Sequence, residues 1–181
     1  MSVVVEVRNR QRSWRVDRVR VGAFSESLLR DSLGLGEATL GIHLVGARAM
    51  AAMNWRWLRH EGSTDILTFD HRERSDAPLH GELWISVDDA VRQSVDFGVT
   101  ADEELARYVI HGILHLLGYD DLEPASRRVM KRVENRWVRR LAGKGQVSGW
   151  VGRKECPRQR VSRKAGQGGE KSKRKPGRDR E

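Results

Sequence analysis

Hydrophobic and polar positions follow two different rhythms along this chain, and together they predict a mixed fold. Runs of β-branched and apolar residues four to eight positions long are typical of strands, whereas apolar residues three or four positions apart are typical of helices. The first pattern predicts strands at Val3–Val7, Ala38–Val45, Asp65–Phe69 and Glu82–Val87, and the second predicts helices at 16–33, 47–58, 88–97, 100–117 and from Pro124 onwards. We therefore expect an α/β (α+β) fold in which a small mixed sheet of about four strands packs with helices.

Local signals mark the ends of the last two predicted helices. Thr100 followed three residues later by Glu103 matches a capping box, which satisfies free backbone N–H groups at a helix start. Gly118 suits the position just after a helix because glycine tolerates a positive φ. The final helix begins near Pro124 and should turn one apolar face towards the core, with Met130, Val133, Trp137 and Leu141 on it.

Charge is distributed unevenly between two parts of the chain. Of the net charge of +9, residues 1–142 contribute nothing, with 21 Lys and Arg against 21 Asp and Glu, whereas residues 143–181 carry 13 against 4. The second segment has few large apolar side chains, so it cannot bury enough surface to offset the entropy lost on ordering. We expect one domain over 1–142 and a disordered basic tail over 143–181, which either binds RNA through its phosphates or is a solubilising extension.

Composition narrows both the cellular setting and the chemistry. Cys156 is the single cysteine, so an intramolecular disulfide is excluded and any metal would be held by nitrogen and oxygen ligands. No apolar run approaches the roughly 20 residues that span a bilayer. The N-terminus lacks the apolar stretch and cleavage site of a signal peptide. We expect a cytoplasmic protein without a membrane partner.

The segment from His111 to Asp121 carries the clearest chemical signal. Two histidines four residues apart on a helix project from the same face, so His111 and His115 can reach a single ion. Such a pair alone is more often two histidines at the edge of a core. Gly118 changes this interpretation because it lets the chain turn back, so that Asp121 can supply a third ligand. Asp120 is the alternative third ligand, or it caps the last helix.

A three-ligand site is typical of a catalytic metal. Three protein ligands leave one coordination position open for a water molecule, which zinc activates as a nucleophile near neutral pH. The arrangement is similar to that of the metzincin proteases, which also use a glutamate beside the first histidine as general base. This chain has Gly112 at that position, so peptidase chemistry of that kind is not expected.

The same segment resembles H-G-x-L-H-L-x-G-Y-D-H, the signature of the YbeY family of metal-dependent endoribonucleases that mature ribosomal RNA. Ser63 to Phe69 resembles the family's P-T-D-V-L-S-F segment, Gly81 to Val87 resembles G-D-I-V-I-S-L, and Ala90 to Gly98 resembles the helix that follows. The blocks stand in the family's order. The resemblance implies a zincin-like fold, a metal site formed by the two histidines and Asp121, a precursor ribosomal RNA as substrate and the small ribosomal subunit as partner.

Two residues depart from the commonest form of that family. Asp121 stands where that form has histidine; a carboxylate is an acceptable zinc ligand, and it also admits manganese or iron. Leu58 stands where that form has an arginine thought to assist at the phosphate. Arg59 or His60, which follow directly, can take this catalytic role, and a solvated surface position is the alternative for Arg59.

Four further polar residues lie near these motifs. Thr64 and Asp65 are interpreted as capping a turn at the start of a strand, with a part in catalysis as the alternative, and His71 and His80 are given no role. The resulting prediction is a single-strand-type endoribonuclease of ribosome biogenesis, with His111 and His115 at its catalytic metal. Two alternatives stay open: a ribosome assembly factor in which the metal is structural, and a metal hydrolase acting on another class of substrate.

Overall fold

The computed structural model of the 181-residue chain describes residues 2–143 and 145–153. Their elements, in chain order, are β1 (Val3–Asn9), β2 (Trp14–Val16), α1 (Arg18–Ser27), a π-helical turn η1 (Leu28–Ser32), β3 (Ala38–Val45), α2 (Ala47–Leu58), β4 (Ile66–Asp70), β5 (Leu79–Ser86), α3 (Val87–Phe97), α4 (Ala101–Leu116), α5 (Pro124–Ala142) and β6 (Val151–Arg153). None of the helices described is long and apolar enough to cross a membrane.

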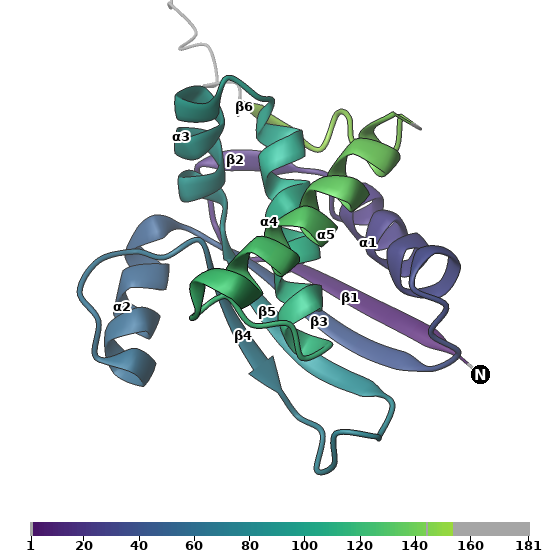
Figure 1. Ribbon diagram of the computed structural model, residues 1–181. Helices are drawn as coiled ribbons and strands as arrows, with labels where there is room; N and C mark the ends of the chain where they lie inside the picture. The colour runs from purple at the N-terminus through teal and green to yellow at the C-terminus, as the bar shows by residue number, and fades with distance from the viewer. Residues whose placement is uncertain (1, 144, 154–181) are drawn as a thin grey trace, which may run out of the picture.

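The main sheet has four strands in the order β1-β3-β5-β4. Strands β1, β3 and β5 run parallel, and β4 pairs antiparallel with β5, so β4 forms one edge of the sheet. The prediction of a small mixed sheet packed with helices is therefore confirmed. Connections of the parallel strands pass through helices, as parallel pairing requires, and this brings the helices onto the faces of the sheet (Figure 1).

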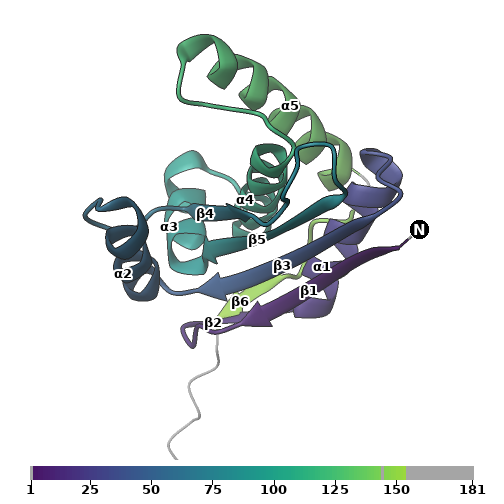
Figure 2. The same ribbon diagram turned by 90° about the horizontal axis from the view of Figure 1, so that it is seen from below.

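Alternation along β3 divides the interior into two parts. Leu40, Ile42 and Leu44 point to the main core, whereas Val45 joins a smaller cluster with Met50 of α2. The main core is completed chiefly by α1 and by α4, which crosses the sheet, and α5 packs on the outer side of α4 (Figures 1 and 2). Helix α4 is consequently covered on most of its surface, and the site it carries lies at the edge of this core.

The predicted helix at 16–33 is shorter in the structure. Val16 belongs to β2, and the α-helix runs from Arg18 to Ser27 before the π-helical turn. The reason lies in Asp17, whose carboxylate accepts hydrogen bonds from the backbone N–H groups of Val19 and Arg20 and so begins the helix there. The helical spacing of apolar residues already begins before Asp17. Periodicity alone therefore does not show where the helix starts.

The expected disorder of residues 143–181 does not begin at 143. Strand β6 pairs antiparallel with β2, and Trp150 is 1% exposed, packed edge-to-face on Phe24 with ring centroids 4.8 Å apart. One large aromatic side chain that docks on an existing core can order a short segment, because most of the entropy cost has been met by the domain itself. The remainder of the predicted tail, 154–181, lies outside the described residues.

Candidate metal centre

Helix α4 supplies the two histidines of the candidate site, and its ends are formed as predicted. The Thr100 hydroxyl accepts a hydrogen bond from the backbone N–H of Glu103, and the Glu103 carboxylate accepts one from the backbone N–H of Thr100, which completes the capping box. The helix ends at Leu116, and Gly118 follows with φ of 89°. This left-handed conformation, which glycine adopts without strain, turns the chain back towards the histidine face of α4.

Three predicted ligands meet at the end of α4. The Nε2 atoms of His111 and His115 lie 3.0 Å apart, and each lies 3.8 Å from a different carboxylate oxygen of Asp121. One ligand atom from each residue lies within 4.8 Å of those of the other two. Asp120 points elsewhere: its carboxylate accepts hydrogen bonds from the backbone N–H groups of Asp121 and Leu122 and holds the turn.

The hydrogen bond that each ring makes at Nδ1 decides whether its Nε2 atom is free to bind a metal. Nδ1 of His115 lies 3.1 Å from the carbonyl oxygen of Tyr119, and Nδ1 of His111 lies 3.0 Å from a carboxylate oxygen of Glu134. Both oxygens only accept, so each Nδ1 carries its hydrogen and donates it. In the neutral rings the two Nε2 lone pairs then face each other, an arrangement that a cation between them stabilises. The donor set of two imidazoles and a carboxylate thus fits zinc.

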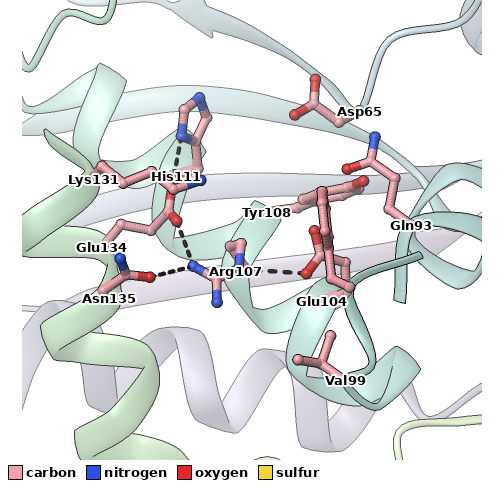
Figure 3. Close-up of a pocket in the computed structure, with 11 residues that line it drawn as sticks. Asp65, Gln93, Val99, Glu104, Arg107, Tyr108, His111, Lys131, Glu134 and Asn135 are labelled. Atoms are coloured by element: carbon pink, nitrogen blue, oxygen red, sulfur yellow. Dashed lines mark hydrogen bonds and ion pairs between the residues drawn. The ribbon is translucent and has the colours of Figure 1, made fainter. Parts of the chain in front are cut away.

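Glu134 of α5 contacts the candidate ligand His111, and sequence reasoning missed it. It is 4% exposed. It also accepts a hydrogen bond from Arg107 at 2.6 Å; Figure 3 marks this contact with a dashed line. Burial raises the pKa of Glu134, but the hydrogen bonds from His111 and Arg107 outweigh it and the pKa is lowered. A signal was present in the sequence, because position 134 falls four residues after Met130 on the apolar face of the predicted helix.

The charge of Glu134 acts back on the histidine. Burial lowers the pKa of His111, but the hydrogen bond and the negative charge of Glu134 outweigh it, so that the pKa is raised above its usual value. A carboxylate behind a ligating imidazole fixes the orientation of the ring and makes its free nitrogen a stronger donor to a metal. The pair therefore prepares His111 for the role that the sequence predicts.

Gly112 faces the sheet on the side of α4 away from the ion ligands. A Cβ atom at this position would lie 2.7 Å from Cδ2 of Leu83 and would also collide with Ile66. Core side chains thus occupy the space in which the metzincin glutamate would begin.

A hollow of about 490 Å³ opens beside the candidate ligands, bounded by α2, β4 and α4. His111, His115 and Asp121 line one side of it, and Trp57 and Phe69 line another, with ring centroids 5.6 Å apart. Trp57 is 58% exposed. An aromatic pair, with Trp57 exposed and Phe69 half-buried, thus shares a hollow with the three candidate metal ligands. The sequence did not indicate this juxtaposition.

Leu58 and Arg59 are adjacent in the chain but have different surroundings in the structure. Leu58 lines the hollow, whereas Arg59 lines neither this hollow nor its neighbour and ends α2 in the left-handed conformation, with φ of 57°. Its guanidinium lies 6.0 Å from the centroid of the Trp55 ring. Arg59 is thus an exposed residue outside the lining of this hollow. This position agrees with the surface alternative, and its catalytic role stays a prediction. His60 is exposed and lines neither hollow.

Asp65 has the capping role predicted for it, and it also lines two hollows, which the sequence did not indicate. Its carboxylate accepts hydrogen bonds from the hydroxyl of Thr64 at 2.9 Å and from the backbone N–H of Ile66 at 3.0 Å. It also lines the hollow at the candidate ligands and a second hollow of about 270 Å³ between α3, α4 and α5 (Figure 3). Asp65 and His111 are common to both hollows, so the carboxylate stands at their junction.

Comparison with known proteins gives consistent matches. A family model described as "Endoribonuclease YbeY" matches residues 6–142. Relatives named endoribonuclease YbeY come from Anaeromyxobacter sp., at 41% identity over 104 residues (57% of this chain, 54% of the relative), and from Thermus thermophilus, at 35% over 111 residues (60% and 80%). One from Frankia casuarinae is 34% identical over 145 residues, covering 74% of this chain and 72% of the relative.

A solved structure extends the likeness to the fold. The solution structure of a Thermotoga maritima protein matches with a TM-score of 0.59 at 23% identity, over 79% of this chain and 92% of the other. The matched region spans about half of the Anaeromyxobacter relative, at 54%, and 64% of a relative from Chlorobium phaeovibrioides. The family model, by contrast, includes every candidate ligand, because its match runs to residue 142.

Proposed function

Because the chain belongs to the endoribonuclease YbeY family, we propose that it cleaves RNA with a divalent metal ion held by His111, His115 and Asp121. The observation that carries the proposal is the convergence of these three side chains, each offering a ligand atom within 4.8 Å of the others. Zinc is the first choice of ion because two imidazoles and a carboxylate are a common catalytic zinc set, and manganese or iron are compatible with the carboxylate.

The metal, when bound, supplies activation of water for attack on a phosphodiester and stabilisation of developing negative charge. The protein's own part is to orient the ligands. Glu134 and the carbonyl of Tyr119 hold the two imidazoles by their Nδ1 atoms, so that both Nε2 atoms point to the same place. Asp121 is brought there by the turn at Gly118.

The form of the hollow supports a single-stranded segment as substrate. Trp57 is more than half exposed in the hollow that the candidate ligands line, and a free nucleobase can stack on such a ring. A base within a duplex has its faces covered by its neighbours. Stacking on Trp57 or Phe69 would hold the chain of an unpaired RNA with a phosphate near the ion without selecting a particular base.

The natural substrate that we propose is a precursor of ribosomal RNA, cleaved in the cytoplasm during maturation of the small ribosomal subunit. This finer assignment rests on the family's motifs, above all on the His111 to Asp121 segment. The hydrolysis of RNA and the choice of this RNA are separate claims. They are tested separately by comparing a precursor ribosomal RNA with an unrelated single-stranded RNA of equal length.

The deciding experiment uses the full chain, freed of metal and then reconstituted with zinc, manganese or iron. We expect cleavage of the precursor RNA by the reconstituted protein and a loss of at least about a hundredfold in His115→Ala, which lacks one of three ligands. Trp57→Ala should raise KM and leave kcat nearly unchanged. Equal cleavage by the parent and His115→Ala would overturn the proposal and favour an assembly factor with a structural metal.

A further inference from the structure

The outward face of α5 carries a concentration of positive charge that the candidate metal centre does not use. Between Pro124 and Ala142 the helix has seven basic residues, all exposed, and a single acidic residue, the buried Glu134. The basic residues are Arg127, Arg128, Lys131, Arg132, Arg136, Arg139 and Arg140. No exposed carboxylate lies among them along the helix.

Helical spacing places four of these side chains in one row. Arg128, Arg132, Arg136 and Arg139 are separated by four, four and three residues, so they follow one side of the helix. The opposite side of α5 carries the buried residues Met130, Glu134, Val138 and Leu141. The row therefore faces solvent, and at 1.5 Å per residue it is about 17 Å long. We call these four residues the arginine row.

The arginine row has no partner within the molecule as far as the structure describes it. No ion pair or hydrogen bond joins its guanidinium groups to any described residue, whereas Arg107 of α4 is bound by both Glu104 and Glu134. Four unpaired like charges repel one another across adjacent turns and cost stability. A partner of opposite charge would relieve this repulsion.

The basic side of α5 continues to the candidate metal centre. Arg127, in the first turn, donates a hydrogen bond to the backbone carbonyl of Asp121 at 2.8 Å. Lys131, one turn later, lines the smaller hollow together with His111 (Figure 3). A polyanion lying on the arginine row would thus have its next segment beside the candidate ligands.

We propose that the arginine row is a docking surface for the phosphate backbone of RNA, which holds the substrate on the side of the cleavage site formed by α5. The proposal rests on the proposed function for the identity of the polyanion. Arginine suits this partner because its planar guanidinium pairs with phosphate through two hydrogen bonds. The row reads no base, so it contributes affinity and position without sequence preference.

A membrane surface is a poorer occupant. A helix that lies on a bilayer needs an apolar face free to enter the lipid, in addition to its basic face. The apolar face of α5 is packed on α4, with Met130 at 1% and Leu141 at 1% exposed. Anionic lipid can then offer only surface charge, whereas RNA offers a line of phosphates along the row.

The test compares two variants of the full chain with equal changes in net charge. In the first, Arg128, Arg132, Arg136 and Arg139 are all changed to Gln. In the control, four exposed arginines near β2 and the start of α2 are changed to Gln: Arg12, Arg15, Arg18 and Arg48. Figure 2 shows β1 and β2 on the opposite side of the molecule from α5. Glutamine keeps helix propensity, so both variants should fold, as circular dichroism will show.

Binding of a labelled single-stranded RNA is measured over a range of salt concentrations, with a chelator present so that no cleavage occurs. For the arginine-row variant we expect Kd to rise about tenfold or more, and the slope of log K against log salt to fall by up to about 3, or about 0.7 for each lost phosphate contact. The control should change the slope by less than about 1. A fourfold Arg→Lys variant of the row should keep most of the binding.

Equal losses in the row variant and the control would overturn the proposal, because net charge alone would then explain binding. Unchanged RNA binding in the row variant would also overturn it, as would a loss confined to binding of phosphatidylserine vesicles. The outcome is distinguishable from failure of the nuclease proposal. If the row governs RNA binding but neither parent nor reconstituted protein cleaves RNA, the docking surface stands and the enzymatic assignment falls.

Discussion

The molecule contains two pairs of neighbouring histidines, and the surroundings of the two pairs are very different. His111 and His115 lie on α4 with ring centroids 4.6 Å apart, and His71 and His80 lie where β4 and β5 leave the sheet, with centroids 5.4 Å apart. The first pair is partly buried and anchored at both Nδ1 atoms, and Asp121 lies 3.8 Å from each. The second pair is exposed, and neither ring has a side-chain hydrogen bond to another described residue.

The difference shows what the first pair offers a metal ion beyond the proximity of two imidazoles. Rings with free rotation offer their nitrogens in many directions, and the entropy of fixing them opposes binding. At α4 that cost has been met during folding, because Glu134 and the Tyr119 carbonyl already hold the rings with both Nε2 atoms inward. A third ligand completes the site only at the first pair among the described residues.

The largest effect should come from removing a ligand of the first pair. His111→Ala is expected to weaken zinc binding at least about a hundredfold, whereas His80→Ala should leave it unchanged. Calorimetric titration of the metal-free full chain with zinc measures both. A comparable loss in His80→Ala would mean that the exposed pair also takes part in zinc binding, against the difference between the two pairs.

Removing the carboxylate behind the ring should have the next largest effect. Glu134→Gln keeps an acceptor for the His111 Nδ1–H group but removes the charge, and we expect zinc affinity to fall about tenfold to a hundredfold. Glu104→Gln is the matched control, because Glu104 is equally buried and also pairs with Arg107 but does not contact a histidine. Equal losses in the two variants would assign the effect to Arg107 or to the fold, and not to the ring.

The core position between the two ligands provides a test of how firmly α4 is seated. Gly112→Ala is expected to destabilise the protein by about 1–3 kcal/mol, since its Cβ meets Leu83 and Ile66. Gly152→Ala, at a position with nothing within 4 Å of an added Cβ, should change stability far less. Urea unfolding of both variants measures the difference in stability. Similar midpoints would show that α4 can shift without loss of stability.

The smallest effect is expected from exchanging the third ligand. Asp121→His restores the residue found in the commonest form of the family and should change zinc affinity by less than about tenfold, because both side chains are suitable ligands. Asp121→Ala, which removes the ligand, should weaken binding clearly more. If Asp121→Ala binds zinc as the parent does, then Asp121 is not a ligand and a water or another carboxylate completes the site.

Much of the fold followed from the sequence because its signals are local. Strand β3 and helix α2 were predicted with the bounds that the structure has, and the capping box at Thr100 and the turn at Gly118 occur as expected. The ligand set depends on residues within one helix and the loop after it. Spacing along ten residues was therefore enough to bring His111, His115 and Asp121 together.

Other features required contacts between distant parts of the chain. Strand β6 was missed because a composition that favours disorder is outweighed by one tryptophan docked against Phe24, some 126 residues away in the chain (150 − 24). The position of Arg59 outside the hollow depends on how α2 ends beside Trp55, which a motif shifted by one residue does not reveal.

By itself the sequence determined the type and order of the main elements and the residues offered to a metal, since helix periodicity, caps and turns act over a few residues. Tertiary structure alone decided which carboxylate stands behind His111, which aromatic rings share its hollow, and that the four arginines of α5 have no ion-pair partner among the described residues. These depend on the packing of α5 on α4 and of α2 on the sheet. The physical reason is that burial, orientation and exposure belong to the packed molecule and not to any single segment of it.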